Sequence, residues 1–263
     1  MTDWLALCRD ATSDVRAALA ELPSRAHREP VVGAGKGGDE TVAVDAAAER
    51  VVLARLEAVD EEITIVSEEV GTFGAGRTHV VIDPIDGSLN AKRGIPFFAL
   101  SIAVASGPAM GDVEFGYVHD FGTGEEWTAT RGEGARLNGD LLGGDAPKDR
   151  IEILSFEATL TSSVAEKAAA VVGIAHRLRI MGSLALSLCH LAAGRVDAVC
   201  SLKPARSVDI AAAQLLVRER GFAIDLPEAP PFEAAPLDVE GRSRVVAAGT
   251  PELCQLLTAA LSA

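Results

Sequence analysis

The sequence predicts a layered α/β protein. Two patterns of apolar residues indicate sheets covered by helices, and the length of the chain allows for the cores between these layers. In the first part of the chain, two stretches with helical spacing of apolar residues precede several short apolar stretches joined by turns, as in an antiparallel sheet. Beyond a glycine- and aspartate-rich stretch at 132–149, strand-like and helix-like stretches alternate. The 263 residues, 48% of them hydrophobic, are enough for sizeable cores. We therefore expect an α+β half over residues 1–145 and an α/β half over residues 146–263.

The first half is predicted to begin with two helices. Residues 3–22 carry apolar side chains at helical spacing, and residues 45–58 form a second helix with Asp45 as its expected N-cap. Strands are expected to follow, and the last two are joined by the turn-like "DFGTG". The predicted strands are 62–69, 78–83, 97–105, 112–119 and 125–131.

The second half is predicted to alternate between strands and helices. Thr250 is expected to cap the last helix, with Pro251 at the first helical position. The predicted strands are 151–156, 176–181, 196–202, 222–226 and 244–249, and the predicted helices are 163–172, 183–193, 207–220 and 250–261.

Charge and composition exclude several classes of function. The net charge of −14 disfavours nonspecific nucleic-acid binding and contact with an anionic membrane surface. The four cysteines have no CxxC spacing, which favours a reducing compartment over a zinc ribbon or a disulfide framework. The acidic, amphipathic N-terminal stretch does not resemble a secretory signal, and there is no uninterrupted run of 18 apolar residues. We therefore expect a cytoplasmic protein without nucleic-acid or membrane partners.

Several carboxylates fall at the ends of predicted elements. The pair in "VIDPIDGSLN", Asp83 and Asp86, would be an ordinary turn if it stood alone. If the strand that ends at Glu68–Glu69 lies beside the strand that ends at Asp83, however, several carboxylates converge. Such like charges repel one another unless cations lie between them, and oxygen ligands favour Mg²⁺ over Zn²⁺. The acidic residues at element ends are Asp45, Glu68, Glu69, Asp83, Asp86 and Asp209.

The residues after Asp86 are suited to binding phosphate. Gly87 permits a tight turn, and Ser88 can begin a short helix, so that the amides of both would point at an anion. Carboxylates that hold a metal beside such amides indicate a site for phosphoryl transfer or phosphate hydrolysis.

The combination of motifs resembles the inositol monophosphatase superfamily of Mg²⁺-dependent, lithium-sensitive phosphatases. The resemblance rests on "DPIDGS" followed by Asn90, on "SEE" upstream and on "SVDIAAAQLLV" downstream. The stretches "IVSEEVG", "GIPFFALSIAV" and "ARSVDIAA" are most similar to the branch of archaeal-type fructose-1,6-bisphosphatase/inositol monophosphatase enzymes. The resemblance implies an αβαβα sandwich of the sugar-phosphatase fold, a homodimer, and two to three Mg²⁺ ions at each site.

The resemblance also implies a role for individual residues. Glu68, Asp83 and the carbonyl of Ile85 would hold the first metal, and Asp83, Asp86 and Asp209 the second. A third, weaker ion would lie near Glu68, and the catalytic residues would be Asp45, Ser88 and Glu68. Asp45 and the Ser88 hydroxyl would orient and deprotonate the attacking water, while the amides of Gly87 and Ser88 bind phosphate. Lys36 matches a mobile loop, and the remaining implied substrate contacts are Gly182, Ser183 and Leu184.

Two basic residues upstream of Asp209 are candidates for binding a second anionic group of the substrate. They are Lys203 and Arg206, in "CSLKPAR". The same stretch has the C-x5-R spacing of a cysteine phosphatase loop, but it lacks the glycine that such a loop needs, and Cys200 is expected to end a buried strand.

The expected function is hydrolysis of a small polyol or sugar phosphate, inositol-1-phosphate or fructose-1,6-bisphosphate, by in-line attack of an activated water. Two alternatives stay open: a 3′-phosphoadenosine-5′-phosphate phosphatase, and a catalytically silent regulatory protein that binds metal and anions. The stretches "AAA" at 211–213 and "RERGF" at 218–222 depart from the superfamily pattern, and these departures bear on the substrate and not on the metal chemistry, because every expected ligand is present.

Overall fold

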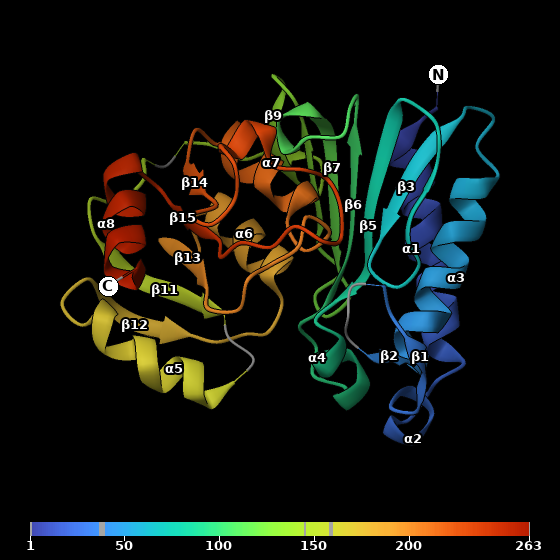
Figure 1. Cartoon of the computed structure of the whole chain (residues 1–263), viewed down its shortest axis with the longest axis horizontal. Coiled ribbons are helices and arrows are strands. Elements are labelled where there is room, and N and C mark those ends of the chain that lie inside the picture. Colours follow the sequence, from blue (N-terminus) through green and yellow to red (C-terminus); the bar gives the residue numbers. More distant parts are fainter. Residues whose placement is uncertain (1, 37–39, 145, 158–159, 263) are drawn as a thin grey trace.

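Two β-sheets alternate with three layers of helices in the computed structural model (Figure 1). The structure describes residues 2–36, 40–144, 146–157 and 160–262. In these residues one sheet has eight strands and the other has five, and a small hairpin accompanies them. The arrangement confirms the predicted αβαβα sandwich.

Most elements lie within a few residues of the predictions, with several additional short strands and one additional short helix. The helix predicted at 163–172 covers Thr161–Lys167 and continues as a 3-10 helix over Ala168–Val171. The helices are α1 (Trp4–Ala20), α2 (Arg25–Arg28), α3 (Ala43–Glu57), α4 (Ser88–Arg93), α5 (Thr161–Lys167), α6 (Leu184–Ala192), α7 (Ala211–Glu219) and α8 (Pro251–Ser262). The larger sheet contains, in spatial order, β10 (Asp140–Leu141), β9 (Gly134–Leu137), β8 (Glu126–Thr130), β7 (Val113–Asp120), β6 (Ala99–Ala105), β5 (Thr78–Asp86), β3 (Ile63–Ser67) and β4 (Gly71–Gly74). The smaller sheet contains β12 (Ala175–Arg179), β11 (Ile151–Glu157), β13 (Ala198–Ser201), β15 (Val246–Ala248) and β14 (Ala223–Asp225). The hairpin is β1 (Val31–Ala34) with β2 (Glu40–Val42).

Each face of the two sheets is buried against helices. Helices α1 and α3 cover the outer face of the larger sheet, α6 and α7 fill the space between the sheets, and α8 covers the outer face of the smaller one (Figure 1). Among the described residues, no helix is both long and apolar enough to cross a membrane. All strands of the larger sheet precede residue 142 and all strands of the smaller sheet follow residue 150. The division of the chain at 145/146 stays a prediction, and Asp145 lies outside the described residues.

Helix α7 crosses from the second half of the chain onto the larger sheet, where it packs against β7. Gly116 in β7 makes this approach possible, because a β-carbon there would lie 2.5 Å from the carbonyl oxygen of Ala212. The alanines at 211–213 are buried at this contact. Small residues on both sides therefore bring the N-terminal end of α7, and the loop before it, close to the larger sheet.

Two predicted helix starts were wrong. Val42 is the N-cap of α3, so Asp45 lies in the first helical turn instead of capping it. Helix α7 begins at Ala211 and not at Ser207, because its N-cap Ile210 has a φ of −133°, outside the helical range, and residues 208–210 form a turn. The predicted cap of α8 was confirmed, since the Leu253 N–H donates to the Thr250 hydroxyl at 3.3 Å.

Candidate active site

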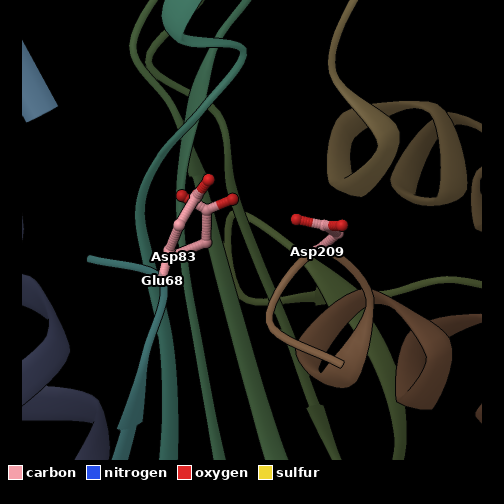
Figure 2. Close-up of side chains that lie close together, drawn as sticks. All are labelled: Glu68, Asp83 and Asp209. Atoms are coloured by element: carbon pink, nitrogen blue, oxygen red, sulfur yellow. The ribbon is translucent and has the colours of Figure 1, made fainter. Parts of the chain in front are cut away.

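Three carboxylates from distant parts of the chain meet at one end of the larger sheet. Strands β3 and β5 are parallel neighbours and Ser67 is paired with Ile82, so Glu68 and Asp83 come next on adjacent strands. Asp209 faces them from the loop before α7 (Figure 2). Each residue offers one carboxylate oxygen, and these oxygens all lie within 4.8 Å of one another.

The protonation of this cluster reflects burial and mutual repulsion. Burial raises the pKa of Glu68 to about 8, and Asp209 and Glu69 add to the effect against the opposing charge of Arg206. Burial and the charges of Glu68, Asp86 and Asp209 also raise the pKa of Asp83 well above its ordinary value. A group of oxygen ligands that repel one another fits a hard divalent cation such as Mg²⁺.

Asp86 lies three residues after Asp83, on the far side of a β-bulge. Asp83 pairs with Ser101 and Asp86 with Ala99, so β5 has one more residue than β6 between these pairs. The Ile85 N–H donates to Asp83 Oδ1 at 3.0 Å within the bulge. The bulge changes the direction of the strand, and both carboxylates line the same cleft.

Asp86 is held from the other half of the chain. Its Oδ2 accepts a hydrogen bond from Ser183 Oγ at 2.6 Å and another from the Ala185 N–H at 2.7 Å. Burial raises the pKa of Asp86 to about 7 although the Ser183 hydrogen bond opposes the shift. Among the described residues, the carboxylates whose oxygens lie within 4.8 Å of one another are those of Glu68, Asp83 and Asp209 and do not include Asp86. The role of Asp86 as a metal ligand therefore stays a prediction.

Asp45 and Ser88 lie at the edge of the cluster. Asp45 is buried in the first turn of α3, and its Oδ1 has no hydrogen-bond partner among the described residues. Burial raises its pKa to about 7, and the nearby Glu69 also raises it. The Ser88 hydroxyl donates to the Ile85 carbonyl at 3.0 Å. A buried carboxylate oxygen without a partner fits a site that takes up a cation or a water at this position.

Gly87 makes the turn between β5 and α4. Its φ of +99° belongs to the left-handed region that favours glycine. A β-carbon at Gly87 would also lie 3.1 Å from the carbonyl oxygens of both Gly182 and Phe97. Gly87 and Ser88 line the cleft, where the first amides of α4 have no partner within the helix.

The loop before α6 forms the opposite wall of the cleft and is anchored by a carboxylate that the sequence reasoning missed. Glu157, at the end of β11, accepts hydrogen bonds at 2.8 Å from the Gly182 N–H and from the hydroxyls of Ser155 and Ser187. Gly182 and Leu184 line the cleft, whereas Ser183 is buried and bonded to Asp86. The position of Glu157 at a strand end was the signal that could have identified it.

The predicted basic residues lie in different surroundings. Arg206 is buried, and its guanidinium forms ion pairs with Glu68 at 2.5 Å and Asp209 at 3.1 Å. Lys203 lines the cleft, as do Lys92 and Arg242, which the sequence reasoning missed because no motif marks them. The backbone N–H of Lys36 donates to the Glu69 carbonyl at 2.9 Å, and residues 37–39 of its predicted loop lie outside the described residues.

The cleft that contains these residues has a volume of about 430 Å³ and is lined by residues from both halves of the chain. It brings together nearly all of the predicted site residues. The predicted residues that line it are Asp45, Glu68, Asp83, Ile85, Asp86, Gly87, Ser88, Gly182, Leu184, Lys203, Arg206 and Asp209.

The cysteine-phosphatase interpretation receives no support from the surroundings of Cys200. This residue is fully buried in β13, and burial raises the pKa of its thiol well above the ordinary value. A nucleophilic cysteine needs the opposite environment, exposed and electropositive.

Comparisons with known proteins identify relatives of this chain. The sequence pattern of the inositol monophosphatase family matches residues 6–263. A fructose-1,6-bisphosphatase/inositol-1-monophosphatase of Archaeoglobus fulgidus is 32% identical over 97% of this chain and 98% of its own length. The Nus factor SuhB of Escherichia coli is 36% identical over 73% of this chain and 74% of its own. The crystal structure of an inositol monophosphatase–fructose 1,6-bisphosphatase superposes with a TM-score of 0.85 at 28% identity, covering 98% of this chain and 100% of that one.

Proposed function

Because the chain belongs to the inositol monophosphatase family, we propose that it is a Mg²⁺-dependent phosphatase that hydrolyses a small polyol or sugar phosphate. The observation that carries the proposal is the position of the Glu68–Asp83–Asp209 carboxylates in one cleft with the Gly87–Ser88 turn. A cluster that attracts cations beside amides that attract an anion is suited to a phosphate group bridged by metal.

The proposed ion-binding residues are Glu68, Asp83, Asp86 and Asp209 with the carbonyl of Ile85, and they would hold two to three Mg²⁺. When bound, these ions neutralise the charge of the phosphate and make a water easier to deprotonate. Asp45 and the Ser88 hydroxyl orient that water, and the Asp45 carboxylate accepts its proton. The amides of Gly87 and Ser88 bind the phosphate oxygens. The water then attacks phosphorus in line with the ester oxygen, the phosphorus–oxygen bond to the alcohol breaks, and the departing oxygen takes a proton from water, so that the products are inorganic phosphate and the free alcohol.

For the substrate we propose inositol-1-phosphate, fructose-1,6-bisphosphate, or both. Support comes from the relatives that carry both names, and from Lys203, Lys92 and Arg242 on the walls of the cleft. Fructose-1,6-bisphosphate carries a second phosphate, and lysine and arginine side chains are suited to binding it. Gly182, Ser183 and Leu184 belong to the wall that would face the alcohol. In this proposal Arg206 does not touch the substrate, because its guanidinium forms ion pairs with Glu68 and Asp209.

A regulatory protein without turnover is the second candidate. The observation that favours it is the similarity to a relative named Nus factor SuhB.

A cytoplasmic homodimer, lithium sensitivity and the absence of a nucleic-acid partner are further proposals. They rest on the family resemblance and on the net charge of −14.

The test is a panel of phosphate esters incubated with the full chain and Mg²⁺, with and without lithium. Phosphate release from inositol-1-phosphate or fructose-1,6-bisphosphate, and much slower release from 3′-phosphoadenosine-5′-phosphate, is the expected result. Preference for the nucleotide would replace the proposed substrate class. No release from any ester by a protein that binds Mg²⁺ would favour the regulatory candidate.

A further inference from the structure

Arg206 lies within the carboxylate cluster and joins two of its members. Its Nη2 is 2.5 Å from Glu68 Oε1 and 3.1 Å from Asp209 Oδ1. Its backbone N–H also donates to Asp209 Oδ2 at 2.7 Å. Only 7% of the residue is exposed. One guanidinium therefore connects the end of β3, in the larger sheet, with the loop that precedes α7.

The guanidinium provides the positive charge that this cluster needs. Glu68, Asp83 and Asp209 place their oxygens within 4.8 Å of one another, and such carboxylates destabilise the fold when they are ionised together. An arginine keeps its charge at every relevant pH and is less strongly hydrated than a lysine, so it suits a buried ion pair. The same charge lies within contact distance of two proposed ligands of Mg²⁺, and a dication binds less well beside a cation.

We propose that Arg206 is a built-in counter-cation that holds Glu68 and Asp209 together and competes with the metal for these two carboxylates. The inference rests on the proposed function, because it takes Glu68 and Asp209 as metal ligands. Mg²⁺ must either displace the guanidinium from them or bind next to its charge. In both cases the side chain lowers the affinity for the metal and stabilises the protein before the metal binds.

A counter-cation affects the stability of the metal-free protein and the affinity for Mg²⁺ in opposite directions, and a purely structural or purely substrate-binding arginine would not. Removing the charge lowers the stability of the metal-free protein and tightens the binding of Mg²⁺. A merely structural arginine would lower both when it is removed, and an arginine that binds only the substrate would change neither. The readouts are therefore stability in EDTA and metal affinity, and neither depends on turnover.

The experiment compares the wild-type chain with Arg206→Gln, Arg206→Lys and the control Lys203→Gln, which removes one charge from the same cleft. The melting temperature is measured in EDTA, and the dissociation constant of Mg²⁺ by calorimetry at pH 8.5. For Arg206→Gln we expect a melting temperature lower by roughly 5–10 °C, since one partner of a buried ion pair is lost. We expect its Mg²⁺ dissociation constant to fall about tenfold.

Two further variants control for loss of charge elsewhere in the cleft and for loss of the fold. Lys203→Gln should stay within about twofold of wild type in metal affinity, because the inference assigns the competition with the metal to the guanidinium that is paired with Glu68 and Asp209. Arg206→Lys keeps the charge but loses the fork-shaped contact, so it should bind Mg²⁺ about threefold more tightly than wild type and serves as the test if the glutamine variant does not fold.

Unchanged or weaker Mg²⁺ binding in the folded Arg206 variants would overturn the inference, as would an equal gain in Lys203→Gln. Phosphate release that requires Mg²⁺, together with unchanged metal affinity in these variants, would overturn the inference alone. A wild-type protein that binds no Mg²⁺ would overturn the proposed metal dependence along with it.

Discussion

Ser183 Oγ donates a 2.6 Å hydrogen bond to Asp86 Oδ2, and this contact joins the cap of α6 to the end of β5. The same hydroxyl accepts from the Leu186 N–H at 3.2 Å, so one serine both caps a helix and orients a carboxylate of the site. The two halves of the chain thus meet at an acidic residue that we propose to bind metal.

The Ser183–Asp86 contact predicts the effect of Ser183→Ala. Without the hydroxyl, the pKa of Asp86 rises further above about 7, because this hydrogen bond holds it down. We expect kcat/KM at neutral pH to fall by about tenfold and the acidic limb of the pH profile to move to higher pH. The profile of phosphate release against pH checks this. Ser162→Ala, on the exposed face of α5, is the matched control and should behave as wild type.

Replacing the glycine at each end of α4 by alanine should have different effects on stability and activity. Gly87 and Gly94 both have a positive φ, but a β-carbon at Gly94 would meet nothing within 4 Å, whereas one at Gly87 would press on the Gly182 and Phe97 carbonyls. Gly94→Ala should therefore cost about 1 kcal/mol of stability and keep the activity. Gly87→Ala should cost roughly 2–3 kcal/mol and lower the activity by at least about a hundredfold. Equal activity in the two variants would contradict the proposed phosphate-binding turn.

The buried carboxyl groups predict how stability depends on pH without metal. Burial raises the pKa values of Asp45 and Asp86 to about 7 and that of Glu68 to about 8, so the folded protein binds these protons more tightly than the unfolded chain does. Stability in EDTA should therefore fall as the pH rises from about 4 to about 8, by an amount on the order of a few kcal/mol. Denaturant unfolding in EDTA across this range measures the slope.

Added Mg²⁺ should offset this loss at pH 8 and have little effect at pH 5, where protons occupy the ligands. Asp86→Asn removes one of the titrating groups and should reduce the slope. A stability in EDTA that rises steadily from pH 4 to pH 8 would contradict this account of the cluster.

The sequence was sufficient to predict the layered fold, because the period of the apolar residues changes clearly between strands and helices and the helices α1, α3 and α8 lie where this period places them. It was also sufficient to predict that Glu68, Asp83 and Asp209 would meet, since the family motifs appear in order. The helix α2 and the short strands β1, β2, β4, β9 and β10 were not predicted, because they do not lie in apolar stretches long enough to show a period, whereas the equally short β14 and β15 lie in stretches of five and six mostly apolar residues.

What could not be predicted depends on contacts between the two halves of the chain. The sequence favoured Arg206 as a substrate contact, but the approach of α7 to β7 at Gly116 brings this side chain to Glu68. Ser183 was expected to border the substrate, and its bond to Asp86 became visible only when the start of α6 was placed beside β5. Such contacts follow from packing, and no local pattern encodes them.

The most direct test of the central claim is the release of phosphate from inositol-1-phosphate and fructose-1,6-bisphosphate by the wild-type chain and by Asp83→Asn, each in Mg²⁺ and in EDTA. We expect turnover only for the wild-type chain in Mg²⁺, and a loss of at least about a thousandfold in the variant, whose fold is checked by circular dichroism. Turnover that persists in EDTA, or a folded Asp83→Asn variant with the wild-type rate, would contradict the claim that these carboxylates form a metal-dependent phosphatase site.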